Sequence, residues 1–337
     1  MLFDFQLACH LIFTACRFIQ NMPNPDTSIA VILPAFNEEL TITAVMQAFN
    51  AALPQAMIVV IDNASTDNTF SLAVGTLQRL ACKGFVLREP LKGKANAVRR
   101  AFLEVDADIY LMADADMTYP AGEASAMIQP LLDGFYDMSV GDRISNGDYA
   151  LENKRPAHMF GNQLVRTLIN WLFGSSLADV MSGYRAMTRR FVKHYPVLIQ
   201  GFELETDLTL YALEGRFRIT EIPIAYKDRP AGSFSKLNTL RDGARVLTTI
   251  TSIVRHHRPL QFFGTIAFVL FSLGLLAGLP AIADYITYQY VYRIPLAVLA
   301  VGLVLSSLLS LATGLILSTI VRGQKILFER ALLFSKG

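Results

Sequence analysis

MADADMTYP, residues 112–120, decides the fold that the sequence predicts. An apolar run of strand type, residues 109–113, leads into it and ends in two carboxylates, Asp114 and Asp116. Side chains at i and i+2 of a strand face the same way, and two carboxylates ~4 Å apart repel by about 4 kcal/mol at an effective dielectric constant of roughly 20. A divalent cation such as Mg²⁺ or Mn²⁺ would relieve that repulsion. The pair predicts a metal site, although a lone Asp-x-Asp can also merely end a strand and cap a turn before Pro120.

Four more apolar runs have strand character, and stretches of helical spacing separate them. This alternation predicts an α/β domain with a doubly wound parallel sheet. In such sheets ligands bind beyond the carboxyl ends of the strands, and Glu38, Asp62 and the Asp114–Asp116 pair all fall at such ends. The sequence therefore predicts one crevice at that edge. The expected strands are residues 28–34, 57–62, 84–89, 109–113 and 136–140.

Two long uncharged runs, residues 260–283 and 294–321, follow the predicted domain. About 20 apolar residues suffice to cross a bilayer as a helix, so both runs predict transmembrane helices. Hydrophobic residues make up 53% of the 337 residues and charged residues only 17%, against about 25% charged in an ordinary soluble domain. The three cysteines form no CxxC or Cys/His spacing, so no zinc or redox motif is indicated.

Basic residues flank the two runs on the sides away from the connection 284–293, which holds one Asp and one Arg. The positive-inside rule then predicts a multi-pass protein of the cytoplasmic membrane, with the catalytic domain and the basic tail 322–337 in the cytoplasm. The basic flanks suit anionic lipid headgroups rather than nucleic acid. They are Arg241, Arg245, Arg255 and Arg258 before the runs, and Arg322, Lys325, Arg330 and Lys336 after them.

Two further segments have amphipathic helical patterns. In residues 1–22 a narrow polar stripe interrupts an apolar helix, and residues 238–259 carry an apolar stripe with arginines largely off it. Both patterns predict helices lying in the membrane interface. The first could instead pack on the soluble domain.

A set of short motifs occurs in a fixed order along residues 28–325, and the set resembles the family-2 glycosyltransferases with the GT-A nucleotide-diphospho-sugar fold. The layout with two spans is similar to polyprenyl-phosphate sugar synthases of the dolichyl-phosphate mannose synthase and bacterial GtrB type. The resemblance implies a catalytic domain over residues 28–237. The motifs are PAFNEE (34–39), IDNASTDNT (61–69), LKGKANAV (91–98), DADMTYP (114–120), GDR (141–143), SGYRAM (182–187) and EIPIAYKDRPAGSFSKL (221–237).

The resemblance implies a site for the nucleotide of a nucleotide sugar, with a UDP-sugar as the expected donor. Asp116 would bind the metal directly, and Asp114 would contact the nucleotide or a metal-bound water. Thr118 stands where the mannose synthases have a glutamine that also serves the metal. The implied nucleotide-binding residues are Pro34, Ala35, Glu38, Asp62, Lys94 and Asp114, with Lys94 reaching a phosphate.

The acceptor implied by the resemblance is a polyprenyl phosphate such as undecaprenyl or dolichyl phosphate. It arrives ionised, so it needs positioning and cationic clamps rather than a strong base. The reaction would invert the anomeric centre, and Glu205 and Asp207 would have structural or positioning roles. The implied catalytic residues are Asp116, Arg143, Arg155, Arg229 and Lys236, and the implied acceptor contacts are Arg143, Arg155, Ser182 and Arg185, with Gly183 beside them.

Three alternatives remain at this point. The chain could transfer sugar to another lipid, or bind nucleotide sugar in the membrane without catalysis. A processive polysaccharide synthase is disfavoured, because Trp171 is the only tryptophan and no Gln-x-x-Arg-Trp motif is present.

Gly274 and Gly278 form a GxxxG pattern, which permits close helix contact either between the two spans or between protomers of a homo-oligomer.

Overall fold

The computed structural model describes residues 27–145, 156–197, 204–225 and 251–334, except 252 and 256. The chain divides into two units, Met1–Lys236 and Leu237–Gly337, and each is considered by itself. The predicted helix 1–22, residues 238–250 of the predicted juxtamembrane helix, and Arg155, Arg229 and Lys236 lie outside the described residues.

The first unit is built on a seven-stranded sheet with the order β3-β2-β1-β4-β6-β5-β7. Strands β1 to β4 pair in parallel, as expected, and β5 pairs in parallel with β7. Strand β6 runs antiparallel to both β4 and β5, so the sheet is mixed and the expectation of a wholly parallel sheet is wrong at this strand. The strands are β1 Ile29–Ala35, β2 Met57–Asp62, β3 Gly84–Arg88, β4 Ile109–Met112, β5 Met138–Asp142, β6 Arg185–Thr188 and β7 Ile219–Pro223.

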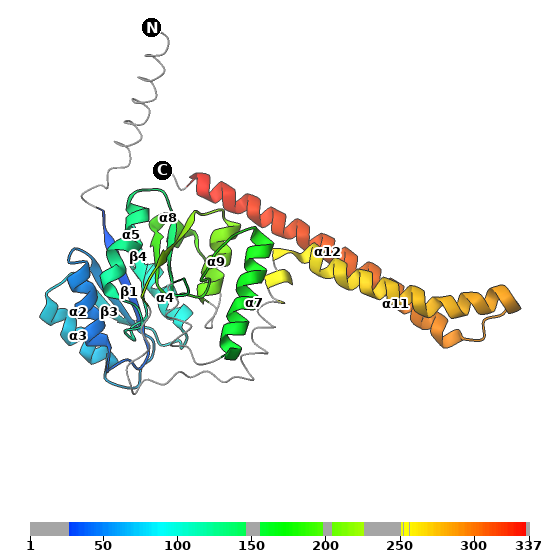
Figure 1. Ribbon diagram of the computed structural model, residues 1–337, viewed down its shortest axis with the longest axis horizontal. Helices are drawn as coiled ribbons and strands as arrows, with labels where there is room; N and C mark the ends of the chain where they lie inside the picture. The colour runs from blue at the N-terminus through cyan, green and yellow to red at the C-terminus, as the bar shows by residue number, and fades with distance from the viewer. Residues whose placement is uncertain are drawn as a thin grey trace, which may run out of the picture. The chain divides into compact units, whose positions relative to one another are not determined.

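Helices cover both faces of the sheet (Figure 1). On one face, alternate strand residues such as Leu33 and Val60 share a buried cluster with Phe49 of α2 and Met127 of α5. On the other face, Phe102 of α4 packs edge-to-face on Tyr110 of β4. Because both faces are covered, the strands read as nearly continuous apolar runs. The helices are α2 Ile42–Ala52, α3 Thr69–Leu80, α4 Lys94–Glu104, the 3-10 turn η1 Ala121–Glu123, α5 Ala124–Leu132, α7 Pro156–Phe173, α8 Arg189–His194 and α9 Leu204–Glu214.

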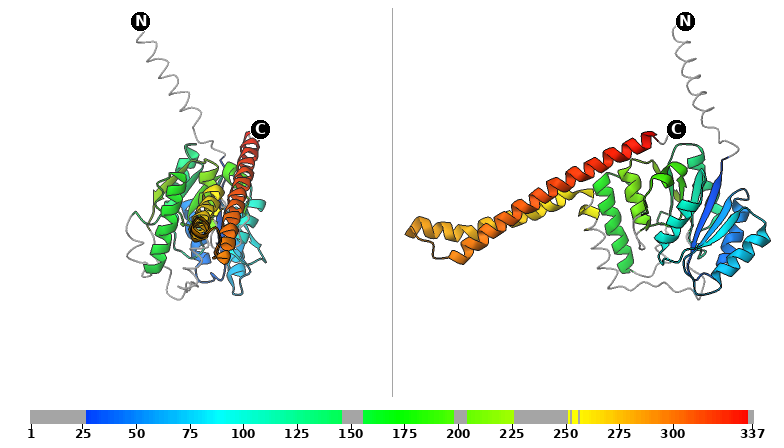
Figure 2. Two further views of the ribbon diagram at one scale, coloured as in Figure 1. Left: turned by 90° about the vertical axis from the view of Figure 1, so that its right-hand side faces the viewer. Right: turned by 180° about the vertical axis from the view of Figure 1, so that it is seen from behind.

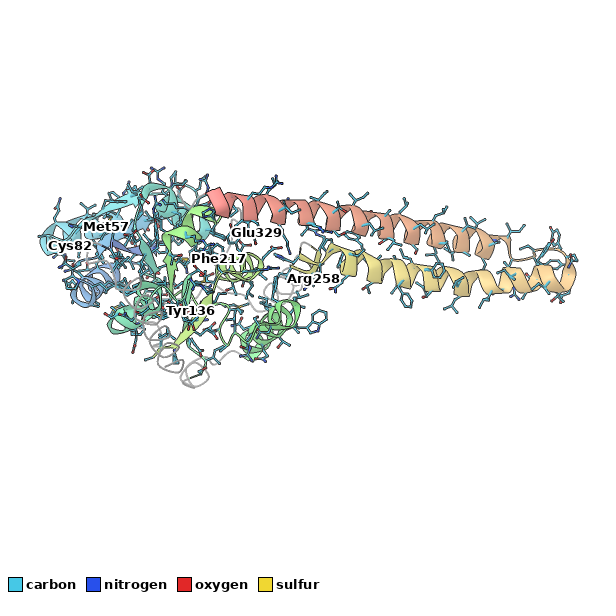
Figure 3. All side chains as sticks on the ribbon, turned by 90° about the horizontal axis from the view of Figure 1, so that it is seen from above. Met57, Cys82, Tyr136, Phe217, Arg258 and Glu329 are labelled. Carbon is cyan, nitrogen blue, oxygen red and sulfur yellow. The ribbon has the colours of Figure 1, made fainter. Side chains whose placement is uncertain are left out.

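The strand register brings distant segments to the carboxyl edge of the sheet. Asp62 is paired with Ala35 on one side and Arg88 on the other. Because β6 is antiparallel, its first residue, Arg185, pairs with Met112 near the end of β4, so the residues just before β6 meet those just after β4. Figure 3 labels residues at or just before the starts of parallel strands, which mark the opposite, amino-terminal edge: Met57, Cys82, Tyr136 and Phe217.

The second unit contains two long helices, α11 Pro259–Tyr288 and α12 Ile294–Phe334, which run side by side (Figure 2). The parts Pro259–Tyr288 and Ile294–Ala331 are long and apolar enough to cross a membrane, and they contain both predicted spans. Helix α12 continues to Phe334, so most of the predicted basic tail 322–337 is helical.

The GxxxG pattern is used inside this helix pair. A Cβ atom on Gly274 would lie 2.9 Å from Val304 Cγ2 and 3.3 Å from the Ala300 carbonyl oxygen, both on α12. A Cβ atom on Gly278 would contact the Ala300 Cβ at 3.5 Å. The first of the two contacts expected from the sequence, the one between the spans, is therefore observed, and the homo-oligomer stays a prediction.

Candidate active site

The Asp114–Asp116 loop begins where β4 ends and is held in a tight turn. Met117 adopts a left-handed backbone conformation with φ of 64°, which costs a residue with a side chain roughly 1–2 kcal/mol. Thr118 donates two hydrogen bonds to Asp116 Oδ1, from its backbone nitrogen at 3.1 Å and its hydroxyl at 2.6 Å. Asp116 is only 2% exposed. Thr118 thus orients the carboxylate of Asp116.

Lys94 supplies a positive charge next to this loop. Its ammonium group forms a close ion pair with Asp114 and a second one with Glu205 Oε1 at 2.6 Å. Burial opposes the charged form of Lys94, yet the two carboxylates prevail and raise the pKa of the ammonium above its ordinary value. The chain therefore offsets the charge of Asp114 itself, and the phosphate contact that the resemblance implies for Lys94 stays a prediction. Glu205, expected to have a positioning role, is part of this cluster.

The loop before Lys94 is fixed by Asn63, which follows β2 directly. The Asn63 side chain accepts a hydrogen bond from the Gly93 nitrogen at 2.7 Å and donates one to the Leu91 carbonyl at 2.6 Å. Gly93 has φ of 125°, in the region that favours glycine. Our sequence reasoning missed Asn63, although its position after a strand end was a usable signal.

Gly183 lies against the Lys94–Asp114 pair. Its nitrogen donates to the Tyr119 hydroxyl at 2.8 Å. A Cβ atom at this position would lie 2.9 Å from Lys94 Nζ and 3.1 Å from Asp114 Oδ2, too close for an undisturbed contact. Burial raises the pKa of Tyr119, so its hydroxyl stays protonated. The absence of a side chain at Gly183 thus leaves room for the Lys94–Asp114 pair.

Asp62 carries an unused buried acceptor. The residue is 1% exposed, and its Oδ1 has no hydrogen-bond partner within the part of the chain that the structure describes. Its other oxygen lies 3.7 Å from Arg88 Nε. An unpaired buried acceptor costs about 1–3 kcal/mol, which a bound ligand with an N–H or O–H donor would offset. This is the observation that most directly indicates a ligand at this edge.

The other residues expected at the nucleotide pocket lie on the adjoining turn after β1. Pro34 and Ala35 end β1 beside Asp62. The Thr41 hydroxyl bridges Glu38 Oε2 at 3.1 Å and the Ala115 carbonyl at 2.7 Å. This bridge joins the turn of Glu38 to the Asp114–Asp116 loop, so the two segments form one wall.

Arg143 is held by a chain of polar contacts that begins on β7. It forms a two-pronged ion pair with Asp179, with Nε–Oδ2 at 2.7 Å and Nη2–Oδ1 at 3.0 Å. The nitrogens of Ala178 and Asp179 donate to the Glu221 carboxylate at 2.8–2.9 Å. Burial raises the pKa of Glu221. Asp179 and Glu221 therefore orient Arg143, and sequence reasoning assigned neither.

Ser182 and Arg185, expected to contact the acceptor, have no exposed surface. The Arg185 guanidinium donates to the carbonyls of Ser182 at 2.8 Å and Val180 at 2.9 Å. It lies beneath residues 180–182 and supports them, because β6 directs its first side chain into the core. The acceptor contact expected for this pair is thus corrected to a supporting role.

Few side chains are available for a metal. In the described ranges, no group of three His, Cys, Asp or Glu residues gathers in a metal-binding arrangement. Magnesium is commonly held by one or two carboxylates together with substrate phosphates. Asp116, ordered by Thr118, and Asp114 fit a cation of that kind, with the remaining ligands supplied by substrate and water.

The comparisons with known proteins identify the class. The family model "Glycosyl transferase family 2" matches residues 30–195. Glycosyltransferase AglJ of Haloferax volcanii is 31% identical over 278 residues, which are 81% of this chain and 85% of that protein. The chain belongs to glycosyltransferase family 2.

More distant similarities agree with this assignment. Polyprenol monophosphomannose synthase of Mycolicibacterium smegmatis is 25% identical over 62% of this chain and 80% of its own length. The crystal structure of glucosyl-3-phosphoglycerate synthase from Mycobacterium tuberculosis with Mn²⁺, UDP and phosphoglyceric acid aligns with a TM-score of 0.52. It shares 20% identity and covers 69% of this chain and 78% of that chain. The predicted GT-A-like fold and glycosyltransferase class are confirmed.

Proposed function

We propose that this glycosyltransferase moves a sugar from a nucleotide-diphosphate sugar, a UDP-sugar, to a polyprenyl phosphate at the cytoplasmic face of a membrane. The observation that carries the proposal is that Asp62, Asp114 and Asp116 all lie at the carboxyl edge of the sheet, in a chain with two candidate spans. The similarity to the polyprenol monophosphomannose synthase supports the lipid acceptor.

The donor would bind beside Asp62. Its buried, unpartnered Oδ1 suits the N–H of a uracil ring or a ribose hydroxyl, because a buried acceptor gains most from a donor that excludes water. Pro34, Ala35 and Glu38 would line the same pocket. The Thr41 bridge keeps this wall in place against the Asp114–Asp116 loop.

The divalent cation, Mg²⁺ or Mn²⁺, would be held by Asp116 with Asp114 beside it. When bound, such an ion neutralises charge on a departing diphosphate. The chain's own contribution is to present these carboxylates in a fixed orientation: Thr118 holds Asp116, and Lys94 holds Asp114. The presence of Mn²⁺ in the glucosyl-3-phosphoglycerate synthase complex supports this choice of ion.

The acceptor phosphate is already an anion and attacks without losing a proton to a base. It would be held by Arg143, whose guanidinium is oriented by Asp179, together with Arg155, Arg229 and Lys236. Attack from the face opposite the diphosphate inverts the anomeric centre, so an α-linked donor gives a β-linked lipid-phosphate sugar. With the predicted orientation of the spans, this site would face the cytoplasm, where nucleotide sugars are available.

The test measures transfer from a panel of UDP-sugars to undecaprenyl phosphate by the full chain in vesicles. Replacement of Arg143 by Ala should raise the apparent KM for the lipid and lower kcat/KM roughly tenfold to a hundredfold, since a charge-assisted contact is worth about 1.5–3 kcal/mol. UDP affinity with metal should stay nearly unchanged.

The matched control is Arg218→Ala. Arg218 also pairs with an aspartate, Asp137, at 3.2 Å, but this pair lies at the amino-terminal edge of the sheet, so transfer should be unaffected. Transfer only to a lipid without phosphate, or an Arg143→Ala variant that loses UDP and retains lipid affinity, would refute the proposed acceptor.

A further inference from the structure

The hydroxyl of Tyr119 is a buried hydrogen-bond donor at the candidate active site. Tyr119 is 7% exposed, and its hydroxyl oxygen accepts a hydrogen bond from the Gly183 nitrogen at 2.8 Å. Within the ranges that the structure describes, this is the only hydrogen bond of the side chain, so the hydrogen of the hydroxyl has no acceptor there. A phenol keeps this hydrogen at neutral pH, because its ordinary pKa is about 10. The hydroxyl can therefore donate to a ligand.

This hydroxyl lies among the charged groups of the site. A Cβ atom built on Gly183 would lie 3.2 Å from the Tyr119 hydroxyl. The same atom would lie 2.9 Å from Lys94 Nζ and 3.1 Å from Asp114 Oδ2, so the three groups surround one point. The positive charge of Arg143 also acts on the hydroxyl. Tyr119 is thus close both to Asp114, which the proposed function assigns to the donor, and to Arg143, which it assigns to the acceptor phosphate.

Aromatic packing holds the Tyr119 side chain in one orientation. Its ring stacks on the ring of Tyr184, with the centroids 5.3 Å apart and the planes 26° from parallel. Tyr184 packs edge-to-face on Phe49, and its hydroxyl donates to the Pro120 carbonyl at 3.3 Å. Ring pairs of these two kinds are the favoured arrangements. The Tyr119 hydroxyl is therefore in place before a substrate arrives, which reduces the cost of binding one.

We propose that Tyr119 donates a hydrogen bond to an oxygen substituent on the sugar that is transferred, and that it helps to select that sugar. The inference rests on the proposed function and deepens it. In that reaction the anomeric carbon is bonded first to the donor diphosphate and then to the acceptor phosphate, so the sugar must lie between the groups that hold the two. A hydroxyl close to both Asp114 and Arg143 is placed to meet the sugar. The contact is a hydrogen bond between neutral groups, and no proton is transferred.

The test is Tyr119→Phe, which removes the hydroxyl and keeps the stacked ring. Binding to the full chain is measured by calorimetry with Mn²⁺ and without lipid, for UDP alone and for UDP-glucose, UDP-galactose and UDP-N-acetylglucosamine. The variant should bind the UDP-sugar that the wild type prefers roughly three- to tenfold more weakly, as expected for the loss of one neutral hydrogen bond. The affinity for UDP alone should not change. The matched control is Tyr184→Phe, which removes the other hydroxyl of the stacked pair and should change neither affinity.

Analogues of the preferred UDP-sugar, each lacking one substituent of the sugar ring, locate the contact. For the analogue that lacks the contacted oxygen, the wild type and Tyr119→Phe should bind with equal affinity. For the other analogues the difference of roughly three- to tenfold should remain. A difference that persists for every analogue would show that Tyr119 contacts no ring substituent, and it overturns the inference.

Two other outcomes also overturn the inference. Equal weakening of UDP and the UDP-sugar would place the contact at the diphosphate, or would show that the variant displaces Gly183. Unchanged UDP-sugar affinity with a raised KM for undecaprenyl phosphate would assign the hydroxyl to the acceptor. If Tyr119→Phe weakens only the UDP-sugar but the wild type transfers no sugar to undecaprenyl phosphate, the proposed acceptor alone fails. If transfer occurs and the variant binds UDP-sugars like the wild type, only this inference fails.

Discussion

Replacement of Lys94 by Met tests whether the chain itself neutralises its paired aspartates. The change removes the ammonium and leaves Asp114 and Glu205 unpaired, with side chains only 27% and 12% exposed. Breaking a fully buried ion pair costs about 3–5 kcal/mol. Allowing for the partial exposure, we expect a loss of roughly 2–4 kcal/mol, or a fall of about 5–15 °C in the unfolding midpoint of a unit of this size.

The measurement is thermal unfolding of the purified chain in detergent. The pKa of Lys94 lies above its ordinary value of 10.5, so the ammonium contributes fully below that pH and the contribution fades only as pH rises beyond it. The difference between wild type and variant should therefore stay constant from neutral pH to about pH 9. Lys92→Met, an exposed lysine two residues earlier, is the matched control and should change stability by less than about 0.5 kcal/mol.

Two further measurements test whether Lys94 neutralises Asp114 and Glu205. Adding Glu205→Gln to Lys94→Met should recover part of the lost stability, because it removes one of the uncompensated charges. Mn²⁺ should also stabilise the variant more than the wild type, since it gains access to Asp114 without competition from the ammonium. If Lys94→Met has the same unfolding midpoint as the wild type, or if adding Glu205→Gln lowers the midpoint further, Lys94 does not neutralise these carboxylates.

Asp116→Asn should retain the fold but lose most transfer, because a neutral amide is a poor ligand for a hard cation; full wild-type activity in a chelator would contradict the metal role. Asp62→Ala should weaken UDP binding, measured by calorimetry with metal present, with a smaller effect on the lipid KM; unchanged UDP affinity would remove Asp62 from the nucleotide pocket. Gly274→Leu should destabilise the α11–α12 pair by about 1–3 kcal/mol through overpacking against α12, whereas Gly264→Leu, which meets nothing within 4 Å, should not; equal effects of the two would contradict the packing. Reporters fused after Gly337 and between α11 and α12 should report the cytoplasm and the far side respectively; the reverse pattern would refute the orientation.

Sequence reasoning found β1 to β5, most of which are largely apolar runs, and missed β6 and β7. Residues 57–62 match β2, because both faces of that strand are covered and the whole run must be apolar. Strand β6, RAMT, was missed. It is four residues long, begins with a charged residue and has no periodic pattern, so only its pairing with β4 and β5 makes it a strand.

The part of the site that could be predicted from the sequence is the part fixed by the positions of residues at strand ends. The residues after parallel strands must share an edge, which placed Asp62, Asp114 and Asp116 together. The contact between Lys94 and Glu205 was not predictable, because it joins side chains 111 residues apart from the starts of two helices. The motif SGYR likewise does not say which way its arginine points, and the antiparallel direction of β6 turns Arg185 into the core.

Strand β6 also has a consequence for the order in which the domain can form. It lies inside the sheet, between β4 and β5, yet it follows both of these strands in the sequence and is therefore synthesised after them. During synthesis β1 to β4 can pair as soon as they emerge, but the half containing β5 has no partner until residues 185–188 follow. Non-local pairing of this kind is slow. We expect the nascent chain to carry a preformed sheet of β1 to β4 for some time, and to add β5 and β7 only after β6 has been synthesised.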